Sequence, residues 1–268
     1  MVLEKVLNPI DRDALRDQVR RAEPFPHFCI DNFLTPEFAD EVEAAFPTLE
    51  EAMKMGRSFA AVNERGKVQI TNSKVFAEPI RRLHEELASP EFLDLMSYAL
   101  DVPGLMADPE LVGGGIHETG PRGHLDVHVD FNYIEERDLH RRANILVYMN
   151  KNWKPEWGGN IELWDKDVKK CHHSFSPIFN RCVVFATNEI SYHGVTAVKC
   201  PEGVMRKSFA AYYYTKEAPA GWTGEKHSTI FKARPNERLK KYLLMPGEKA
   251  KRTMQSTVQK LKRTLKGK

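Results

Sequence analysis

The chain has 268 residues, a formal net charge of +3, and 41% hydrophobic and 29% charged residues, which is typical of a soluble globular protein with a sizeable core. No apolar run approaches the roughly 18 residues that cross a bilayer, and the acidic residues of the first twenty positions exclude an export signal there. The four cysteines include no CxxC pair, which excludes a zinc knuckle and a disulfide framework and favours a cytoplasmic location.

Helical patterns dominate the first part of the chain. We predict helices over residues 11–22, 35–46, 78–88 and 90–100. The second of these has Thr35 as a suitable N-cap and Pro36 at the first helical position. Residues 56–75 are polar and contain glycine, so we expect a loop or short hairpin there. Residues 1–110 are thus predicted to form a helical support region.

Short β-rich runs follow from about residue 111. They cover residues 111–118, 124–131, 143–150, 159–165, 181–187, 193–198 and 207–215, and turn-forming residues separate them. Many short strands favour an antiparallel sandwich or barrel over βαβ units. We therefore predict a mainly β core with supporting helices over residues 111–216. The adjacent His172 and His173 would point to opposite faces of a strand, so we place them in a surface turn rather than in a second metal site.

The predicted C-terminal extension, residues 217–268, ends in a basic segment. Residues 247–268 contain eight Lys or Arg and one acid, a charge of +7, which leaves the rest of the chain at 3 − 7 = −4. A narrow apolar stripe at steps of 4, 3 and 4 predicts an amphipathic helix, formed by Met254, Val258, Leu261 and Leu265. This helix would dock on the body or on a second copy in a homodimer. Membrane or nucleic-acid contact is an alternative, although a solvated charged end is simpler.

A candidate metal site begins on the strand HLDVHVDF. His128 and Asp130 are two residues apart, so a strand would point both toward one face. His193 begins a later predicted strand and is a candidate third ligand. Two histidines and one carboxylate leave three octahedral positions open, as in non-haem Fe(II) oxygenases. Zinc would more often take sulfur, or three protein ligands and a water.

A candidate anion site lies on the strand RKSFAAYYYT. Arg206 precedes an apolar run and is therefore predicted to be buried, where it requires a counter-charge. Its guanidinium fork suits the distal carboxylate of a dicarboxylate. Ser208 would share its face and add a hydroxyl donor, whereas Lys207 would face the opposite way.

Residues 24–215 resemble the prolyl-4-hydroxylase-like branch of the 2-oxoglutarate/Fe(II) oxygenase superfamily. The similar segments, in chain order, are PFPHFCIDNFLTPEFADEVEAAFP, HLDVHVDF, RRANILVYMNKNW with WGGNIELW, NRCVVFATNEISYHGV and MRKSFAAYYYT. The resemblance implies a distorted double-stranded β-helix, which is a jelly-roll barrel with helices supporting one sheet. Animal prolyl 4-hydroxylases use lysine where this chain has Arg206, so the resemblance does not single out a prolyl substrate.

The resemblance also implies cofactors and a reaction. Fe(II) would be held by the three metal ligands named above, with 2-oxoglutarate and O2 as co-substrates. Arg206 would bind the distal carboxylate of 2-oxoglutarate, helped by Ser208 and by Asn144 and Tyr148, which share a face of their predicted strand. The implied activity is oxidation, most simply hydroxylation, of an unactivated C–H bond with release of succinate and CO2.

The substrate is the open part of the prediction. Candidate substrate-lining residues, chosen because they flank the ligands, are His117, Arg122, Asn132, Trp164 and Asn188. A small molecule, such as an amino acid, a sugar or a natural-product intermediate, is the leading hypothesis because no separate recognition domain is evident. A protein or peptide side-chain hydroxylase is the alternative, and an open groove beside residues 56–75 would favour it.

Two further classes remain open at this point. A non-catalytic jelly-roll protein that binds metal or sugar would show no 2-oxoglutarate turnover and little effect of changing Arg206. A nucleic-acid demethylase would show steeply salt-dependent binding, and only the basic C-terminal segment suggests it.

Overall fold

The computed structural model describes residues 6–237 and residue 240. Its helices are Arg12–Arg20 (α1), Pro36–Ala44 (α2), Leu49–Met55 (α3), Glu78–Leu87 (α4) and Pro90–Leu100 (α5). The four predicted helices are confirmed, with ends that move by two residues at most. Short helix α3 was not predicted, although a capping box between Thr48 and Glu51 marks its start. Thr35 makes no side-chain cap bond, contrary to its predicted capping role, and α2 begins with Pro36.

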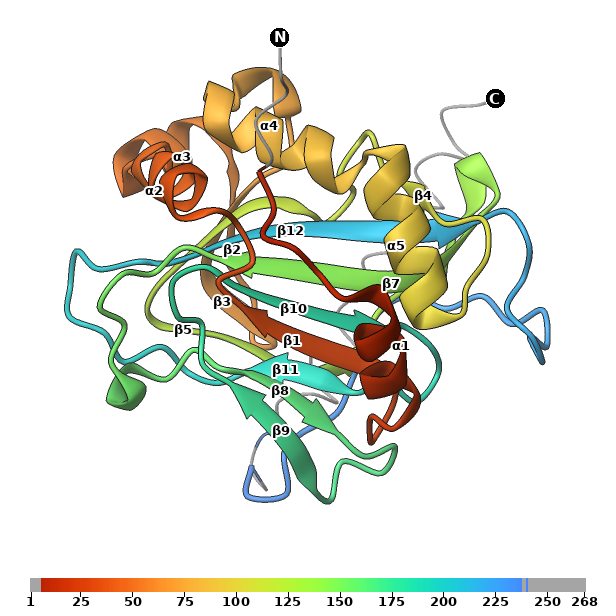
Figure 1. The fold of residues 1–268 in the computed structure, drawn as a ribbon. Helices are drawn as coiled ribbons and strands as arrows, with labels where there is room; N and C mark the ends of the chain where they lie inside the picture. Colours follow the sequence, from red (N-terminus) through yellow and green to blue (C-terminus); the bar gives the residue numbers. More distant parts are fainter. Residues whose placement is uncertain (1–5, 238–239, 241–268) are drawn as a thin grey trace, which may run out of the picture.

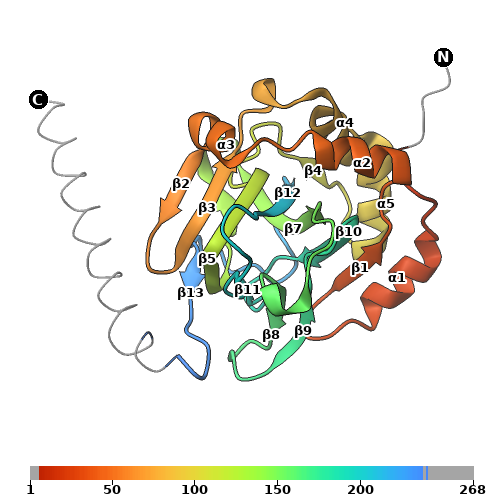
Figure 2. The same cartoon turned by 90° about the vertical axis from the view of Figure 1, so that its left-hand side faces the viewer.

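The strands form one antiparallel sheet. Their bounds are His27–Asp31 (β1), Arg57–Ala60 (β2), Glu64–Ile70 (β3), Met106–Ala107 (β4), Gly115–Val129 (β5), Tyr133–Ile134 (β6), Leu139–Tyr148 (β7), Ile161–Trp164 (β8), Cys171–Phe175 (β9), Arg181–Ala186 (β10), His193–Val195 (β11), Arg206–Thr215 (β12) and Ile230–Phe231 (β13). The main path is β1-β10-β7-β12-β5-β11-β8-β9. The sheet curls into an open barrel, as Figures 1 and 2 show. The predicted mainly β barrel with supporting helices is confirmed.

The helices cover the outer face of the β1-β10-β7-β12 part of the sheet (Figure 1). Strand alternation explains the two faces: Ile145 and Val147 of β7 join the helices in the largest core, whereas Asn144 and Leu146 line the barrel interior. A buried aliphatic side chain contributes about 1.5–3 kcal/mol, so this outer core holds the sheet rigid behind the interior side chains.

The N-terminal 110 residues contribute more than helices. Strand β1 pairs with β10, and hairpin β2–β3 pairs through β3 with β5, so both extend the barrel sheet. The hairpin expected within residues 56–75 is thus present. His172 and His173 lie in β9, which pairs with β8, so the predicted surface turn is wrong there. The pairing of β9 with β8 shifts register between Leu163 and Trp164, so the residues of β9 do not alternate regularly. The residue pattern therefore does not predict this strand.

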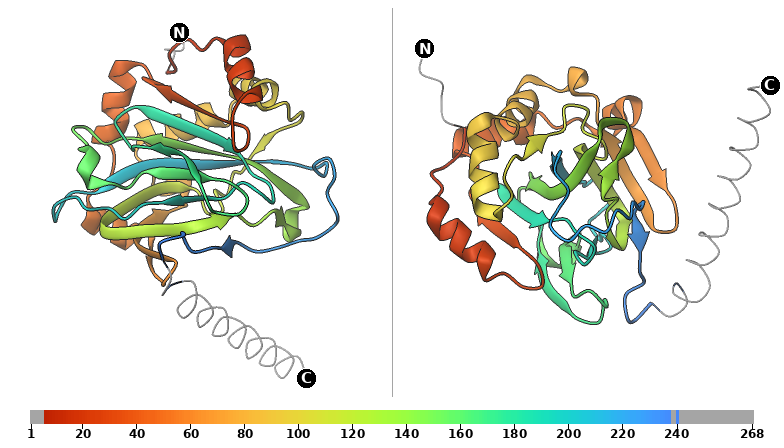
Figure 3. Two further views of the ribbon diagram at one scale, coloured as in Figure 1. Left: turned by 90° about the horizontal axis from the view of Figure 1, so that it is seen from below. Right: turned by 90° about the vertical axis from the view of Figure 1, so that its right-hand side faces the viewer.

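The chain returns to the barrel after β12. Residues 217–237 run along the lower side of the sheet, where β13 pairs with the end of β5 (Figure 3). The predicted basic helix over residues 247–268, with its homodimer and nucleic-acid interpretations, lies outside the described residues. None of the helices in the described part of the chain has the length and apolar character needed to cross a membrane.

Candidate metal site and anion pocket

Three side chains form the one cluster with metal-ligand geometry in the described part of the chain. The ligand atoms of His128, Asp130 and His193 all lie within 4.8 Å of one another. His128 and His193 are register partners on β5 and β11, and Asp130 directly follows β5. Gly194 allows this close approach, because a Cβ atom there would lie 3.0 Å from the backbone of Val127. The three residues that the sequence predicted as metal ligands are therefore brought together.

The histidines present the same nitrogen to the site. His128 Nδ1 lies 2.8 Å from the carbonyl of Asp126, and His193 Nδ1 lies 2.9 Å from the carbonyl of Ser191. An N–H at Nδ1 donates to each carbonyl, which leaves Nε2 as the lone-pair nitrogen. Burial first, and then nearby His128, lower the pKa of His193 to about 3. His193 is thus neutral near pH 7, which is the form that binds metals.

Asp130 is held as a carboxylate. Burial opposes ionisation, but Arg141 first and then His193 and His128 outweigh it, so the pKa of Asp130 lies well below its ordinary value. Arg141 Nη2 is 3.0 Å from Asp130 Oδ2, and Asn144 Nδ2 donates to the same oxygen at 2.8 Å. Asn144 Oδ1 also accepts from Arg141 Nε at 3.0 Å. Asn144, predicted to help bind the co-substrate, is therefore engaged with the carboxylate and with Arg141.

Sequence reasoning missed Arg141. Its guanidinium carbon lies 3.6 Å from the ring centroid of Tyr212, and the side chain is buried. Strand alternation would place Arg141 on the same face as outward-facing Ala143. A register shift in the pairing with β12 skips one residue of β7 between them and turns Arg141 inward. A bulge of this kind leaves no signal in the residue pattern.

A second bulge shapes β5 itself. Its pairing with β11 shifts register between His193 and Val195, so that Leu125 and His128 both line the pocket beside the metal site. Uninterrupted strand alternation would have placed Leu125 and His128 on opposite faces. Asp126 consequently points away from the ligands, toward the C-terminal segment.

The cluster opens into a pocket of about 450 Å³. Every strand from β10 to β13 contributes to its wall, together with β2, β3, β5, β7 and β8. Besides the three ligand residues, the polar residues of the wall include Arg57, Glu64, Lys67, Gln69, His117, Arg141, Asn144, Arg206, Ser208 and Thr229. Phe185 and Phe231 pack against the ligands, with ring centroids 4.5 Å from His193 and 5.4 Å from His128 respectively.

Arg206 is a buried cation without an anionic partner. It is 4% exposed, and it donates from Nε to the carbonyl of Gly159 at 2.6 Å and from Nη2 to Tyr148 Oη at 3.2 Å. No carboxylate among residues 6–237 and 240 lies within 4.0 Å of it. Burial lowers the pKa of Arg206, but a guanidinium keeps its charge in proteins. Since a buried unpaired charge is costly, this end of the pocket fits an anionic ligand.

The surroundings of Arg206 support that assignment. Ser208 is fully buried, its Oγ has no hydrogen-bond partner within the described structure, and it lines the same pocket. Tyr148 does not line the pocket but supports Arg206, and burial raises the pKa of Tyr148 to about 12. Gly159 is required here, because its Cβ would lie 2.9 Å from Arg206 Cδ. Lys207 faces the other way, as predicted, and binds Glu43 at 3.0 Å.

Of the five predicted substrate residues, the pocket wall includes only His117. Its Nε2 lies 3.0 Å from the carbonyl of Gly113 and 3.2 Å from Gln69 Nε2. Arg122 lies instead at an irregular point of β5 with a left-handed φ of 67°, where its side chain is 86% exposed and 3.5 Å from Glu202. It faces solvent, so it is not positioned for the predicted contact.

The remaining three predicted substrate residues have local roles. Asn132 donates to Glu189 and accepts from the backbone N–H of His227, so it anchors the C-terminal segment. Trp164 packs in a small core on the outside of the barrel. Asn188 is exposed and caps a turn, since its Oδ1 accepts from the N–H of Ile190. Proximity in sequence to the ligands does not bring these side chains to the pocket.

Comparison with known proteins gives one family and a consistent set of relatives. Residues 114–214 match the family model described as the 2OG-Fe(II) oxygenase superfamily. A prolyl 3-hydroxylase from mouse, OGFOD1, is 30% identical over 78 residues, which span 28% of this chain and only 14% of that protein.

Solved structures with the same fold include two prolyl hydroxylases. The enzyme from Trichoplax adhaerens, in complex with a hypoxia-inducible-factor peptide fragment, is 21% identical with a TM-score of 0.53 and covers 76% of this chain and 89% of its own. A prolyl-4-hydroxylase from Pseudomonas putida is 14% identical with a TM-score of 0.58 and covers 77% and 100%. At these identities the likeness shows the fold, which is the distorted double-stranded β-helix that the sequence predicted.

Proposed function

We propose that this chain, whose residues 114–214 match the 2OG-Fe(II) oxygenase family model, is a dioxygenase of that superfamily that hydroxylates a side chain in a polypeptide, with a prolyl residue as the first candidate. The observation that carries the oxygenase assignment is the placement of a His-Asp-His cluster and a buried, unpaired Arg206 in one pocket. A metal-binding protein without this chemistry would have no use for the second feature.

The protein's own groups fit the implied cofactors. His128 and His193 direct Nε2 toward Asp130, at 3.5 Å and 3.4 Å from its two oxygens, and so offer three ligand atoms to Fe(II). Arg206 and the unpartnered Ser208 Oγ suit the distal carboxylate of 2-oxoglutarate. When bound, Fe(II) and 2-oxoglutarate together activate O2 for C–H oxidation, with release of succinate and CO2.

Other residues of the pocket position the metal ligands and shape the wall around them. Arg141 and Asn144 fix one oxygen of Asp130, so the carboxylate keeps a single orientation. The rings of Phe185 and Phe231 line the pocket beside the buried ligands and give this part of its wall an apolar surface. The protein thus supplies position and an apolar wall, while the cofactors supply the redox chemistry.

Support for a polypeptide substrate comes from the groove around hairpin β2–β3. A second hollow of about 440 Å³ adjoins the main pocket and shares Arg57, Gln69 and Gly113 with it. Two adjoining hollows suit an extended chain lying beside the hairpin, which could occupy both. The relatives named as prolyl hydroxylases agree with this choice.

A small charged molecule is the second candidate. The wall of the main pocket carries the Lys67–Glu64 ion pair, whose side chains are only 15% and 19% exposed, together with buried His117. Such a wall suits the ammonium and carboxylate groups of an amino acid.

The decisive experiment combines binding with turnover. Anaerobic titration of the purified chain with Fe(II) and 2-oxoglutarate should produce a weak visible charge-transfer band, and His128→Ala should abolish it. Succinate release is then measured with proline-containing peptides, matched peptides that carry alanine instead, and free amino acids and sugars. Proline-dependent release supports our proposal, and release with free metabolites alone supports the second candidate. Absence of the band in the unchanged protein would remove the oxygenase assignment.

A further inference from the structure

We propose that residues 227–234, here named the C-terminal strap, form a substrate-facing wall that continues from the hairpin along the same edge of β5, and that Arg234 is the positioning residue that holds this strap in place. The proposal rests on the proposed function, because it assigns residues that touch the substrate of that same pocket. Nothing in the residue pattern of the strap suggests such a role.

The strap completes the edge of the strand that carries the metal ligands. Hairpin strand β3 pairs with residues 116–125 of β5, and β13 continues along the same strand with Phe231 opposite His128. The backbone N–H of Lys232 donates to the carbonyl of Val127 at 2.8 Å. An uncovered strand edge would expose unpaired backbone groups beside the site, so the strap and hairpin together close it.

Two strap side chains face the pocket. Thr229 and Phe231 both line it, whereas Ile230 between them is 43% exposed, as strand alternation requires. The Phe231 ring lies 5.4 Å from the His128 ring at an interplanar angle of 36°. A substrate that reaches the metal site must therefore pass or contact this pair. Phe231 offers an apolar surface and Thr229 a hydroxyl group.

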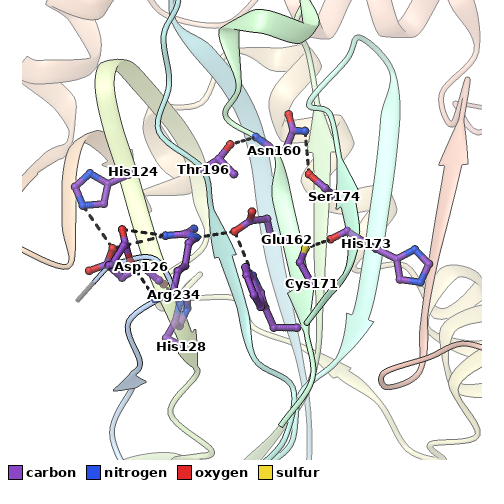
Figure 4. Close-up of polar contacts among 12 residues, drawn as sticks. His124, Asp126, His128, Asn160, Glu162, Cys171, His173, Ser174, Thr196 and Arg234 are labelled. Atoms are coloured by element: carbon purple, nitrogen blue, oxygen red, sulfur yellow. Dashed lines mark hydrogen bonds and ion pairs between the residues drawn. The ribbon is translucent and has the colours of Figure 1, made fainter. Parts of the chain in front are cut away.

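Arg234 joins the strap to two strands at once. Its Nε donates to Glu162 Oε2 at 2.8 Å, and its Nη1 lies 3.9 Å from Asp126 Oδ1 (Figure 4). Glu162 belongs to β8 and Asp126 to β5, and these strands flank β11, which carries His193. One guanidinium thus spans the strand of the third ligand from outside the barrel.

The surroundings make this contact costly to lose. Asp126 is fully buried and also binds Lys240 at 2.5 Å, while the Arg234 side chain is 13% exposed. Glu162 is 12% exposed, and its other partner is Trp164 Nε1 at 3.2 Å. Removing one member of a buried ion pair leaves the other charge without compensation. Loss of Arg234 should therefore release the strap, whereas Lys240 keeps Asp126 paired.

The test uses the full chain with three variants: Arg234→Gln, Glu162→Gln and the double variant. Glutamine at 162 keeps an oxygen for Trp164, so only the charge pair is lost. Arg122→Gln is the matched control, because Arg122 is an exposed arginine whose ion pair lies away from the pocket. Hydrogen–deuterium exchange of the strap is measured first, since it needs neither cofactor nor substrate.

We expect Arg234→Gln to speed strap exchange about tenfold or more, with no effect of the control. The double variant should resemble Arg234→Gln, because Glu162→Gln breaks a contact that Arg234→Gln has already removed. Unchanged exchange in Arg234→Gln, or effects of the two single variants that add, would overturn the positioning role. These outcomes do not depend on whether the chain is an oxygenase.

The substrate-facing role is tested by turnover of whichever peptide or metabolite gives succinate release. Phe231→Ala and Arg234→Gln should each raise substrate KM about tenfold, while the charge-transfer band and the 2-oxoglutarate dissociation constant stay unchanged. Phe231→Leu keeps an apolar side chain of similar size, and so separates lost contact from lost folding. Unchanged substrate KM in both Phe231→Ala and Arg234→Gln would refute the strap as a substrate wall.

Discussion

Two buried arginines of the barrel interior should respond in opposite ways to the same substitution. Arg141 lies 3.0 Å from the carboxylate of Asp130, whereas Arg206 has only the neutral acceptors of Gly159 and Tyr148. We therefore predict that Arg141→Met destabilises the metal-free protein and that Arg206→Met does not. The second substitution should instead remove the binding of 2-oxoglutarate.

The magnitudes follow from charge compensation. Arg141→Met leaves buried Asp130 without its main cation, which typically costs about 3–5 kcal/mol. Arg206→Met removes a desolvated cation, which is stabilising, and leaves the carbonyl of Gly159 without its donor, which is destabilising. These opposing effects should leave the free energy of unfolding within about 1 kcal/mol of that of the unchanged protein. Losing a buried charge-assisted pair with the ligand costs about 3 kcal/mol, which is a rise of roughly 150-fold in the 2-oxoglutarate dissociation constant.

Urea unfolding of the metal-free variants measures the first quantity. Thermal unfolding with increasing 2-oxoglutarate and a redox-inert divalent metal measures the second, because a ligand that binds the folded state raises its stability with concentration. The unchanged protein and Arg122→Gln should show this rise, and Arg206→Met should not. If Arg206→Met loses as much stability as Arg141→Met, Arg206 is a structural residue, and our assignment of the anion site fails.

Three further predictions concern neighbouring groups. Burial raises the pKa of Glu118 from 4.5 to about 7, so its ionisation costs no stability below about pH 4.5, and stability falls as the pH rises from 4.5 through 7. Glu118→Gln should be more stable than the unchanged protein by up to about 3 kcal/mol at pH 8 and equally stable at pH 4, measured by urea unfolding. Tyr148→Phe removes an acceptor of Arg206 and should raise the 2-oxoglutarate dissociation constant about fivefold in the same thermal titration, and an unchanged value would contradict its supporting role. Asn144→Ala removes a donor to Asp130 and should weaken Fe(II) binding about 10–100-fold in an anaerobic competition titration, whereas an effect on 2-oxoglutarate alone would restore the role predicted from the sequence.

The predictable part of the site follows strand alternation. His128 and Asp130 were assigned to one face, as were Arg206 and Ser208, and the structure places all four around one pocket. Lys207 was assigned to the opposite face and lies there. The resemblance supplied His193, since alternation within a single strand says nothing about which distant strand lies beside it.

The features of the site that could not be predicted depend on strand register and on the return of the chain to the barrel after β12. Arg141 turns inward because of a bulge, and a bulge is set by pairing with β12 rather than by the residues of β7. Arg234 reaches Asp126 and Glu162 because β13 pairs with β5 about a hundred residues earlier in the chain. Arg122, by contrast, was chosen for proximity in sequence, but it has a left-handed φ within β5 and its side chain faces solvent.

The pairing of charges distinguishes what the pocket does for itself from what it offers to a ligand. Asp130 is already compensated by Arg141, so its carboxylate is ionised and oriented before any metal arrives. Arg206 has no such partner, so the free-energy cost of burying its charge is offset only when an anion binds beside it. A dicarboxylate that contacts the metal at one end and Arg206 at the other would therefore stabilise the fold as it binds. For the same reason, a carboxylate side chain introduced beside Arg206 would abolish co-substrate binding even though it would stabilise the metal-free protein.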